Sequence, residues 1–188
     1  MGTRHITQVR YGDEIRVSQY GQWDGYPAGQ GLTVFRFLKS EDNVQNLRDN
    51  LANTYVPTED TLQEMIKPYL DGTMEGFMTM ESGQKWSNDF PSLSRDTGAE
   101  ILSLIANAKG LVPLALDLEF VNDALWCEGA YVIDLDADTL TSYWSRHWRE
   151  DDEKQGEWVF EVTLTFEEIR QMSEDDYLAK FESVEVDA

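Results

Sequence analysis

The sequence predicts a single α+β domain that spans residues 1–188. Two blocks of the chain, one at the N-terminus and one within residues 114–164, alternate apolar and polar residues as strands do. Between these blocks, and again after them, apolar residues recur with helical spacing. Because strands and helices are segregated along the chain, we expect an antiparallel sheet of the N-terminal hairpin and the 114–164 strands, packed against helices of residues 32–108 and 165–182.

The first block predicts a β-hairpin. Ile6 and Val9 lie among polar residues in the segment 3–11, and Ile15 and Val17 continue the pattern after a Gly-Asp turn. Two such segments joined by a short polar turn are expected to pair as antiparallel neighbours.

The hairpin leads into residues 20–31, YGQWDGYPAGQG, which contain four glycines, one proline and three aromatic residues. Glycine allows positive φ and close backbone approach, and Pro27 restricts its own φ and the conformation of the residue before it. We therefore expect a tightly folded loop that projects Trp23, Asp24 and Tyr26 towards a ligand or a partner. The alternative is a structural loop whose aromatic rings cover a sheet edge. The glycine spacing matches neither a phosphate-binding loop nor the dinucleotide-binding fingerprint.

Helical spacing resumes directly after this loop. Ser40 and Thr61 are expected helix caps, as is Thr97, and Glu64 and Glu100 would complete two capping boxes. Residues 71–92 show no clear period, so we expect an irregular segment whose Met, Phe and Trp side chains cover the core edge, with a lid or a contact surface as the alternative. The helices of this part of the chain are expected at residues 32–38, 40–53, 57–70 and 97–110.

The second strand block is followed by further helices. Thr165 with Glu168 forms a capping-box pattern, and Ser173 with Asp176 begins a last helix. The segment 150–156 is expected to be an exposed charged loop. The strands of this block are expected at residues 114–120, 125–135, 140–148 and 158–164.

Charge is the strongest global feature, with a formal net value of −21. Residues 150–188 carry fourteen acidic and three basic residues, whereas residues 1–39 carry three acidic and five basic ones. A surface this acidic repels phosphate backbones and anionic lipid, so neither direct nucleic-acid binding nor membrane binding is expected. It favours a basic protein partner, and the simpler interpretation is solubility.

The remaining compositional features predict a cytoplasmic protein. No apolar run approaches the roughly 20 residues of a membrane span, and the first residues have no apolar segment typical of a signal peptide. Cys127 is the one cysteine, so no intrachain disulfide can form, which suits a reducing compartment.

The sequence holds few groups for catalysis. The catalytic candidates are Thr3, Asp24 and Glu128, with the two carboxylates as an acid–base pair if the fold brings them together. A nucleophile pair of Cys127 with a histidine is a weaker alternative. The candidate binding residues lie in the loop and around Glu128: Gln22, Trp23, Asp24, Tyr26, Gln30, Trp126 and Tyr131.

No metal or cofactor is expected. His5, Cys127 and His147 do not have the spacing of a zinc site. The run from Asp134 to Asp138 has alternating aspartates but lacks the glycine and glutamate that an EF-hand loop needs, so an ordinary hairpin turn is expected there.

Three segments carry a resemblance: residues 1–4 (MGTR), 19–31 (QYGQWDGYPAGQG) and 126–136 (WCEGAYVIDLD). In combination they are similar to a family of proteins seen in bacteria, their phages and, more distantly, fungi. That family has no established activity. The resemblance therefore implies that the chain comes from a bacterium or a phage, but it implies no mechanism. The layout of the chain also resembles the N-terminal-nucleophile hydrolases, which need Ser, Thr or Cys as their first residue. Thr3 would meet that need only after loss of Met1 and Gly2.

The expected function is a non-catalytic binding protein, phage-encoded and directed at a host factor through the aromatic loop or the acidic surface. We expect a protein partner, and the alternative is a small-molecule ligand. The alternative is a hydrolase that uses Thr3 or the carboxylates of Asp24 and Glu128.

Overall fold

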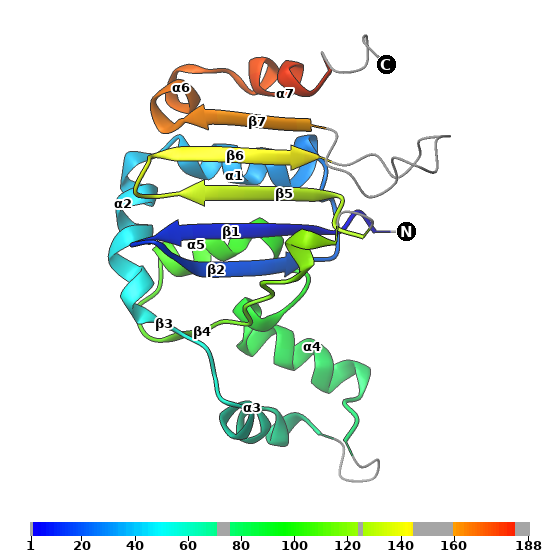
Figure 1. Ribbon diagram of the computed structural model, residues 1–188. Coiled ribbons are helices and arrows are strands. Elements are labelled where there is room, and N and C mark those ends of the chain that lie inside the picture. Colours follow the sequence, from blue (N-terminus) through cyan, green and yellow to red (C-terminus); the bar gives the residue numbers. More distant parts are fainter. Residues whose placement is uncertain (1, 71–75, 124–125, 145–159, 183–188) are drawn as a thin grey trace.

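The computed structural model describes residues 2–70, 76–123, 126–144 and 160–182 (Figure 1). Its main element is a five-stranded sheet with the strand order β2-β1-β5-β6-β7. The strands of this sheet are β1 (His5–Tyr11), β2 (Glu14–Gly21), β5 (Gly129–Asp134), β6 (Thr139–Trp144) and β7 (Phe160–Thr165). A separate two-stranded sheet pairs β3 (Thr54–Tyr55) with β4 (Val112–Pro113).

The main sheet is mixed. The pairs β1–β2, β5–β6 and β6–β7 are antiparallel, whereas β1 and β5 lie parallel. The predicted α+β class is confirmed, but the expectation of a wholly antiparallel sheet is wrong at the β1–β5 junction. These strands are far apart in the sequence, and the path of the intervening helices sets their relative direction, which local patterns do not encode.

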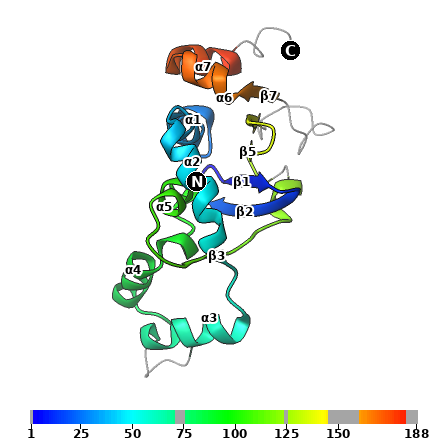
Figure 2. The same ribbon diagram turned by 90° about the vertical axis from the view of Figure 1, so that its left-hand side faces the viewer.

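Helices cover one face of this sheet, as the two views in Figures 1 and 2 show for α1, α2 and α5. The core between the layers contains the fully buried Val9, Tyr131 and Ile133 from the strands, with Phe35 and Ile105 from the helices. The helices are α1 (Leu32–Leu38), α2 (Glu41–Asn50), α3 (Glu59–Ile66), α4 (Met80–Asp89), α5 (Ile101–Ala106), α6 (Phe166–Gln171) and α7 (Glu174–Glu182).

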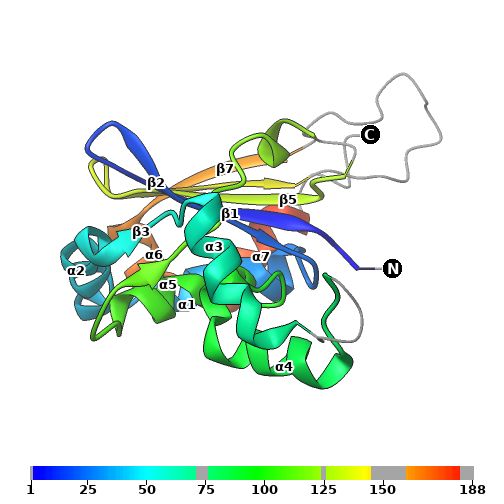
Figure 3. The ribbon, with the colours of Figure 1, turned by 90° about the horizontal axis from the view of Figure 1, so that it is seen from below.

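The segment 114–120 is not the strand that its alternating pattern predicts. It runs beside the edge strand β2, where the amide of Asp117 donates to the carbonyl of Ser18 at 3.0 Å without forming a ladder. A short 3-10 turn, Phe120–Asn122, then lies on the face of the sheet away from the helices (Figure 3). Phe120 packs there against a small buried cluster that includes Ile6 and Cys127. The apolar residues of 114–120 alternate with polar ones because the segment is partly buried against the sheet, although it is not one of its strands.

Helices α3 and α4 extend beyond the main layers (Figures 1 and 2), and neither contains a buried residue. The expectation of an irregular segment is wrong for residues 80–89, which form α4, while residues 71–75 lie outside the described part of the chain. The rings of Tyr69, Trp86 and Phe90 pack together, with Trp86 and Phe90 at a centroid distance of 4.6 Å. This aromatic contact links α4 to the turn after α3, and the local sequence pattern does not reveal it.

The helix caps are partly as predicted. Ser40 accepts a hydrogen bond from the third residue of its helix, and Thr165 with Glu168 forms the predicted reciprocal capping box. The predicted boxes at Thr61 and Thr97 are wrong. Thr58 caps α3, and the hydroxyl of Thr97 donates to a backbone carbonyl before a 3-10 turn instead of capping α5. The predicted exposed loop at 150–156 lies outside the described residues.

Candidate functional site

The Gly-rich loop, residues 21–31, has a fixed backbone. The amide of Gly25 donates to the carbonyl of Thr3 at 2.9 Å, and the amide of Gln30 donates to the carbonyl of Asp24 at 2.8 Å. Asp24 has a φ of 55°, in the left-handed region that non-glycine residues rarely occupy. The second half of the loop, Pro27–Gly31, is a turn of π-helix that continues into α1.

Two of the predicted binding residues make hydrogen bonds that position this loop. Tyr131 is fully buried, and its hydroxyl donates to the carbonyl of Gly25 at 2.8 Å. Burial raises the pKa of Tyr131 well above its usual value, so the hydroxyl stays protonated and keeps this bond. The side-chain oxygen of Gln30 accepts from the amide of Ala99 at 2.9 Å. Tyr131 and Gln30 therefore position the loop, and a partner cannot reach Tyr131 in this conformation.

The N-terminal segment 2–4 lies between the Gly-rich loop and residues 126–129. On one side Thr3 accepts the hydrogen bond from Gly25, and on the other the carbonyl of Arg4 accepts from the amide of Glu128 at 2.9 Å. The backbones that carry the three catalytic candidates, Thr3, Asp24 and Glu128, thus meet at one end of the sheet. Sequence patterns alone did not require this proximity, because it depends on the parallel β1–β5 pairing.

Exposed aromatic rings flank this segment. Trp23, Tyr26 and Trp126 have exposed fractions of 47%, 39% and 49%. The guanidinium of Arg4 lies 4.4 Å from the ring centroid of Trp126 and stacks on it. Gly2 packs against the ring of Trp23, so segment 2–4 contacts both tryptophans. We call Arg4, Trp23, Asp24, Tyr26 and Trp126, which lie in segment 2–4, in the Gly-rich loop and at residue 126, the aromatic surface.

Hydrogen bonds orient the side chains of the aromatic surface. The indole nitrogen of Trp23 donates to a carboxylate oxygen of Asp96 at 2.8 Å, and the hydroxyl of Tyr26 donates to Asp24 at 3.3 Å. The negative charge of Asp24 raises the pKa of Tyr26. Gln22, also a predicted binding residue, is half-buried and accepts from the hydroxyl of Tyr20 at 2.7 Å.

Comparisons with protein-family models, curated proteins and solved structures found no match for this chain. The family resemblance inferred from its motifs stays a prediction. Across the described residues, no helix has both the length and the apolar character needed to cross a membrane.

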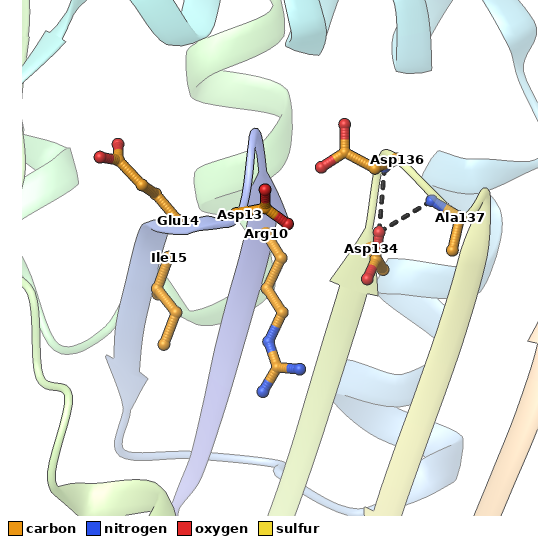
Figure 4. A pocket seen from close by; sticks show the side chains of 7 residues that line it. All are labelled: Arg10, Asp13, Glu14, Ile15, Asp134, Asp136 and Ala137. Atoms are coloured by element: carbon orange, nitrogen blue, oxygen red, sulfur yellow. Dashed lines mark hydrogen bonds between the residues drawn. The ribbon is translucent and has the colours of Figure 1, made fainter.

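A pocket of about 590 Å³ lies at the opposite end of the sheet, between the tips of the β1–β2 and β5–β6 hairpins (Figure 4). Asp134 and Asp136, two of the aspartates that line it, already have protein partners. Asp134 accepts from the amides of Asp136 and Ala137, and Asp136 accepts from the amide of Gly12 at 2.7 Å. The Asp134 contacts are those of a turn, whereas the Asp136 contact joins the two hairpins. In the part of the chain that the structure describes, no group of three or more His, Cys, Asp or Glu side chains could hold a metal ion.

The Cys127–histidine alternative is not supported for His5. Cys127 packs with Ile6 on the sheet face away from the helices, whereas His5 follows the alternate parity of β1 and lies on the helix-covered face. Burial raises the pKa of the Cys127 thiol to about 12, so it is not a thiolate at neutral pH. His147 lies outside the described residues.

Sequence patterns missed three buried polar residues beneath the loop, His5, Thr7 and Gln19. The signal that could have revealed them is strand parity. His5 and Thr7 have the same parity as the core residue Val9, so they face the core despite being polar.

Proposed function

We propose that this chain is a non-catalytic binding protein that recognises a protein partner through the aromatic surface. The observation that carries the proposal is the grouping of two exposed tryptophans, an exposed tyrosine and a stacked arginine around one anchored loop. Trp, Tyr and Arg are the residues most often found to dominate the energy of protein interfaces. Single exposed apolar residues need no explanation, but several around one loop and the segment packed against it do.

The rigidity of the loop supports the same proposal. Hydrogen bonds to Thr3, Tyr131 and Ala99 fix its backbone before any partner arrives. Side chains that are already ordered lose less conformational entropy on binding, so more of the contact energy appears as affinity. A π-helical turn such as Pro27–Gly31 is also an uncommon element that occurs frequently at functional sites.

The partner that best fits this chain is basic. A net charge of −21 raises the association rate of a positively charged protein and disfavours acidic competitors. Within the proposal, the chain is a phage protein that acts in the cytoplasm on a basic host factor. The aromatic surface would contribute most of the binding energy. The acidic residues would raise the rate of association with the basic partner, and this rate would fall as salt rises.

The test compares proteins that co-purify with the wild-type chain and with Trp23→Ala and Trp126→Ala from the native host. For a partner retained by the wild type, we expect each substitution to cost about 2 kcal/mol of binding energy, a loss in affinity of about 30-fold. Binding should also weaken as salt rises, because exposed charges are screened. Isothermal titration calorimetry of the purified partner measures both effects.

Phe77→Ala is the matched control, since Phe77 is an aromatic residue with 68% exposure outside the aromatic surface. It should leave the affinity unchanged. Thermal unfolding of each variant shows whether a loss of binding reflects a loss of fold. If Trp23→Ala, Trp126→Ala and neutralised acidic clusters all retain every partner, the proposal is wrong.

A second candidate function, a carboxylate-dependent hydrolase, rests on the backbone convergence of Asp24 and Glu128 around segment 2–4. It requires that the wild type cleave a member of a panel of amide, ester and glycoside substrates, and that Asp24→Asn and Glu128→Gln each abolish the cleavage. A wild type without hydrolysis rejects it. The Thr3 version additionally requires intact-mass evidence that Met1 and Gly2 are removed. In this structure Gly2 packs against the ring of Trp23.

A further inference from the structure

Three polar side chains lie buried side by side beneath the Gly-rich loop. His5 and Thr7 of β1 are fully buried, and Gln19 of β2 is 4% exposed. Thr7 pairs directly with Gln19 in the β1–β2 register, and His5 pairs with Gly21 at the next position on the same face. The rings of His5 and Tyr131 meet edge to face at 6.4 Å, which places the group on the helix-covered side.

Four polar atoms of this group have no hydrogen-bond partner among the described residues: both ring nitrogens of His5, the hydroxyl oxygen of Thr7 and the side-chain oxygen of Gln19. The orientation of the Gln19 amide is determined, because its nitrogen donates to the carbonyls of Tyr20 and Ser94. The Gln19 oxygen is therefore an acceptor without a donor. Buried polar atoms in folded proteins nearly always have a partner, and four in one place would remove much of the stability of a domain.

The geometry suits a very small guest. Side chains directly opposite on antiparallel strands have Cβ atoms about 5 Å apart, and one water that hydrogen-bonds two groups spans about 5.6 Å between them. Larger guests are disfavoured because the backbone closes over His5. A Cβ on Gly21 or Gly98 would approach the His5 ring to 1.9 Å or 3.0 Å.

The guest must also be neutral. No carboxylate, lysine or arginine contributes to the group, and burying an uncompensated ion is very costly. The hydrogen-bonding needs are those of water. Gln19 needs a donor, neutral His5 offers one acceptor nitrogen, and the Thr7 hydroxyl can donate. The His5 ring also interacts with the carbonyl of Thr3, although outside ordinary hydrogen-bond geometry.

We propose that His5, Thr7 and Gln19 form a binding site for one buried water molecule. The water donates to the Gln19 side-chain oxygen and to a His5 ring nitrogen, and it accepts from the Thr7 hydroxyl. Three hydrogen bonds are the usual number for a buried water. The site joins β1 to β2, and its His5 packs against Gly25 of the Gly-rich loop. It does not depend on the proposed function.

The first test is a crystal structure of the wild-type chain at about 1.5 Å resolution, where ordered waters are visible. We expect a water oxygen within about 2.6–3.2 Å of Gln19, Thr7 and one His5 nitrogen. Direct hydrogen bonds among the three side chains, or no density between them, would overturn the proposal.

The second test is Thr7→Val, which keeps the shape of the side chain and removes the hydroxyl. If water binds there, the substitution removes one of its three partners and should lower Tm by about 3 °C. If the hydroxyl has no partner, a methyl group in its place should raise Tm, which counts against the site. Thr139→Val is the control for the higher strand propensity of valine, because Thr139 is a strand threonine whose side chain makes no hydrogen bond to the residues that the structure describes. The crystal structure decides the question if Thr7→Val does not fold.

Discussion

Gly21→Ala is expected to lower the free energy of unfolding by about 3 kcal/mol or more, at the upper end of overpacking effects. The new Cβ would lie 1.9 Å from Cε1 and 2.4 Å from Nε2 of His5, far inside van der Waals contact. The ring cannot move aside easily, because it is fully buried, Gly98 packs against its Nε2 and Gly25 packs against the Cβ that carries it. The strain should therefore reach the base of the Gly-rich loop.

Urea denaturation of the wild type and of Gly21→Ala measures this effect. Gly83→Ala is the matched control, since Gly83 lies in α4 and a Cβ there meets nothing within 4 Å. Replacing a helical glycine by alanine in open space should stabilise by about 0.5–1 kcal/mol. The two substitutions should therefore change the free energy of unfolding in opposite directions. A Gly21→Ala protein with wild-type stability would show that His5 does not occupy the position described.

The stability of the protein is expected to fall by about 3 kcal/mol between pH 7 and pH 4 through His5 alone. Burial lowers the pKa of His5 from 6.5 to about 4, with a small opposing effect from the Thr3 carbonyl. Below pH 6.5 the unfolded chain binds a proton at His5, whereas the folded chain does so only near pH 4. The stability that depends on a neutral His5 is therefore fully present above pH 6.5, and it is lost as the pH falls towards 4.

NMR titration of the two histidines of the sequence measures the pKa of His5 directly, and His147→Gln identifies its signal. Denaturation from pH 7 to pH 4 then compares the wild type with His5→Gln, which has no titrating ring. The comparison is needed because the lowered pKa values of Glu168, Glu174 and Asp176 also reduce stability in acid. Equal pH dependence in both proteins, or a His5 pKa near 6.5, would contradict the burial of a neutral ring.

Local sequence patterns predicted most of the elements that position the candidate site. The N-terminal hairpin, the helix after Gly31, the Ser40 cap and the Thr165–Glu168 capping box are all present. Each depends on residues a few positions apart, so the physical cause lies within the pattern itself. The same patterns failed at residues 114–120 and 80–89, where burial against distant residues determines the conformation.

The candidate site was predicted in part. Trp23, Tyr26 and Trp126 are exposed as a binding surface requires, but Tyr131 lies in the core and Gln30 holds the backbone of Ala99. An aromatic or amide residue near a glycine-rich stretch looks the same in the sequence whether it faces solvent or supports the loop. Burial depends on the whole fold, so residue type could not separate these roles.

By itself the sequence determined the α+β class, the strong negative charge and the tight turn of the Gly-rich loop, since these follow from composition, period and glycine stereochemistry. Only the tertiary structure decided that β1 and β5 run parallel. That one pairing brings segment 2–4 between Gly25 and Glu128. It also places Tyr131 beside Thr7, which the hairpin already pairs with Gln19. Long-range strand pairing is chosen by the packing of the complete chain, and no local pattern contains that information.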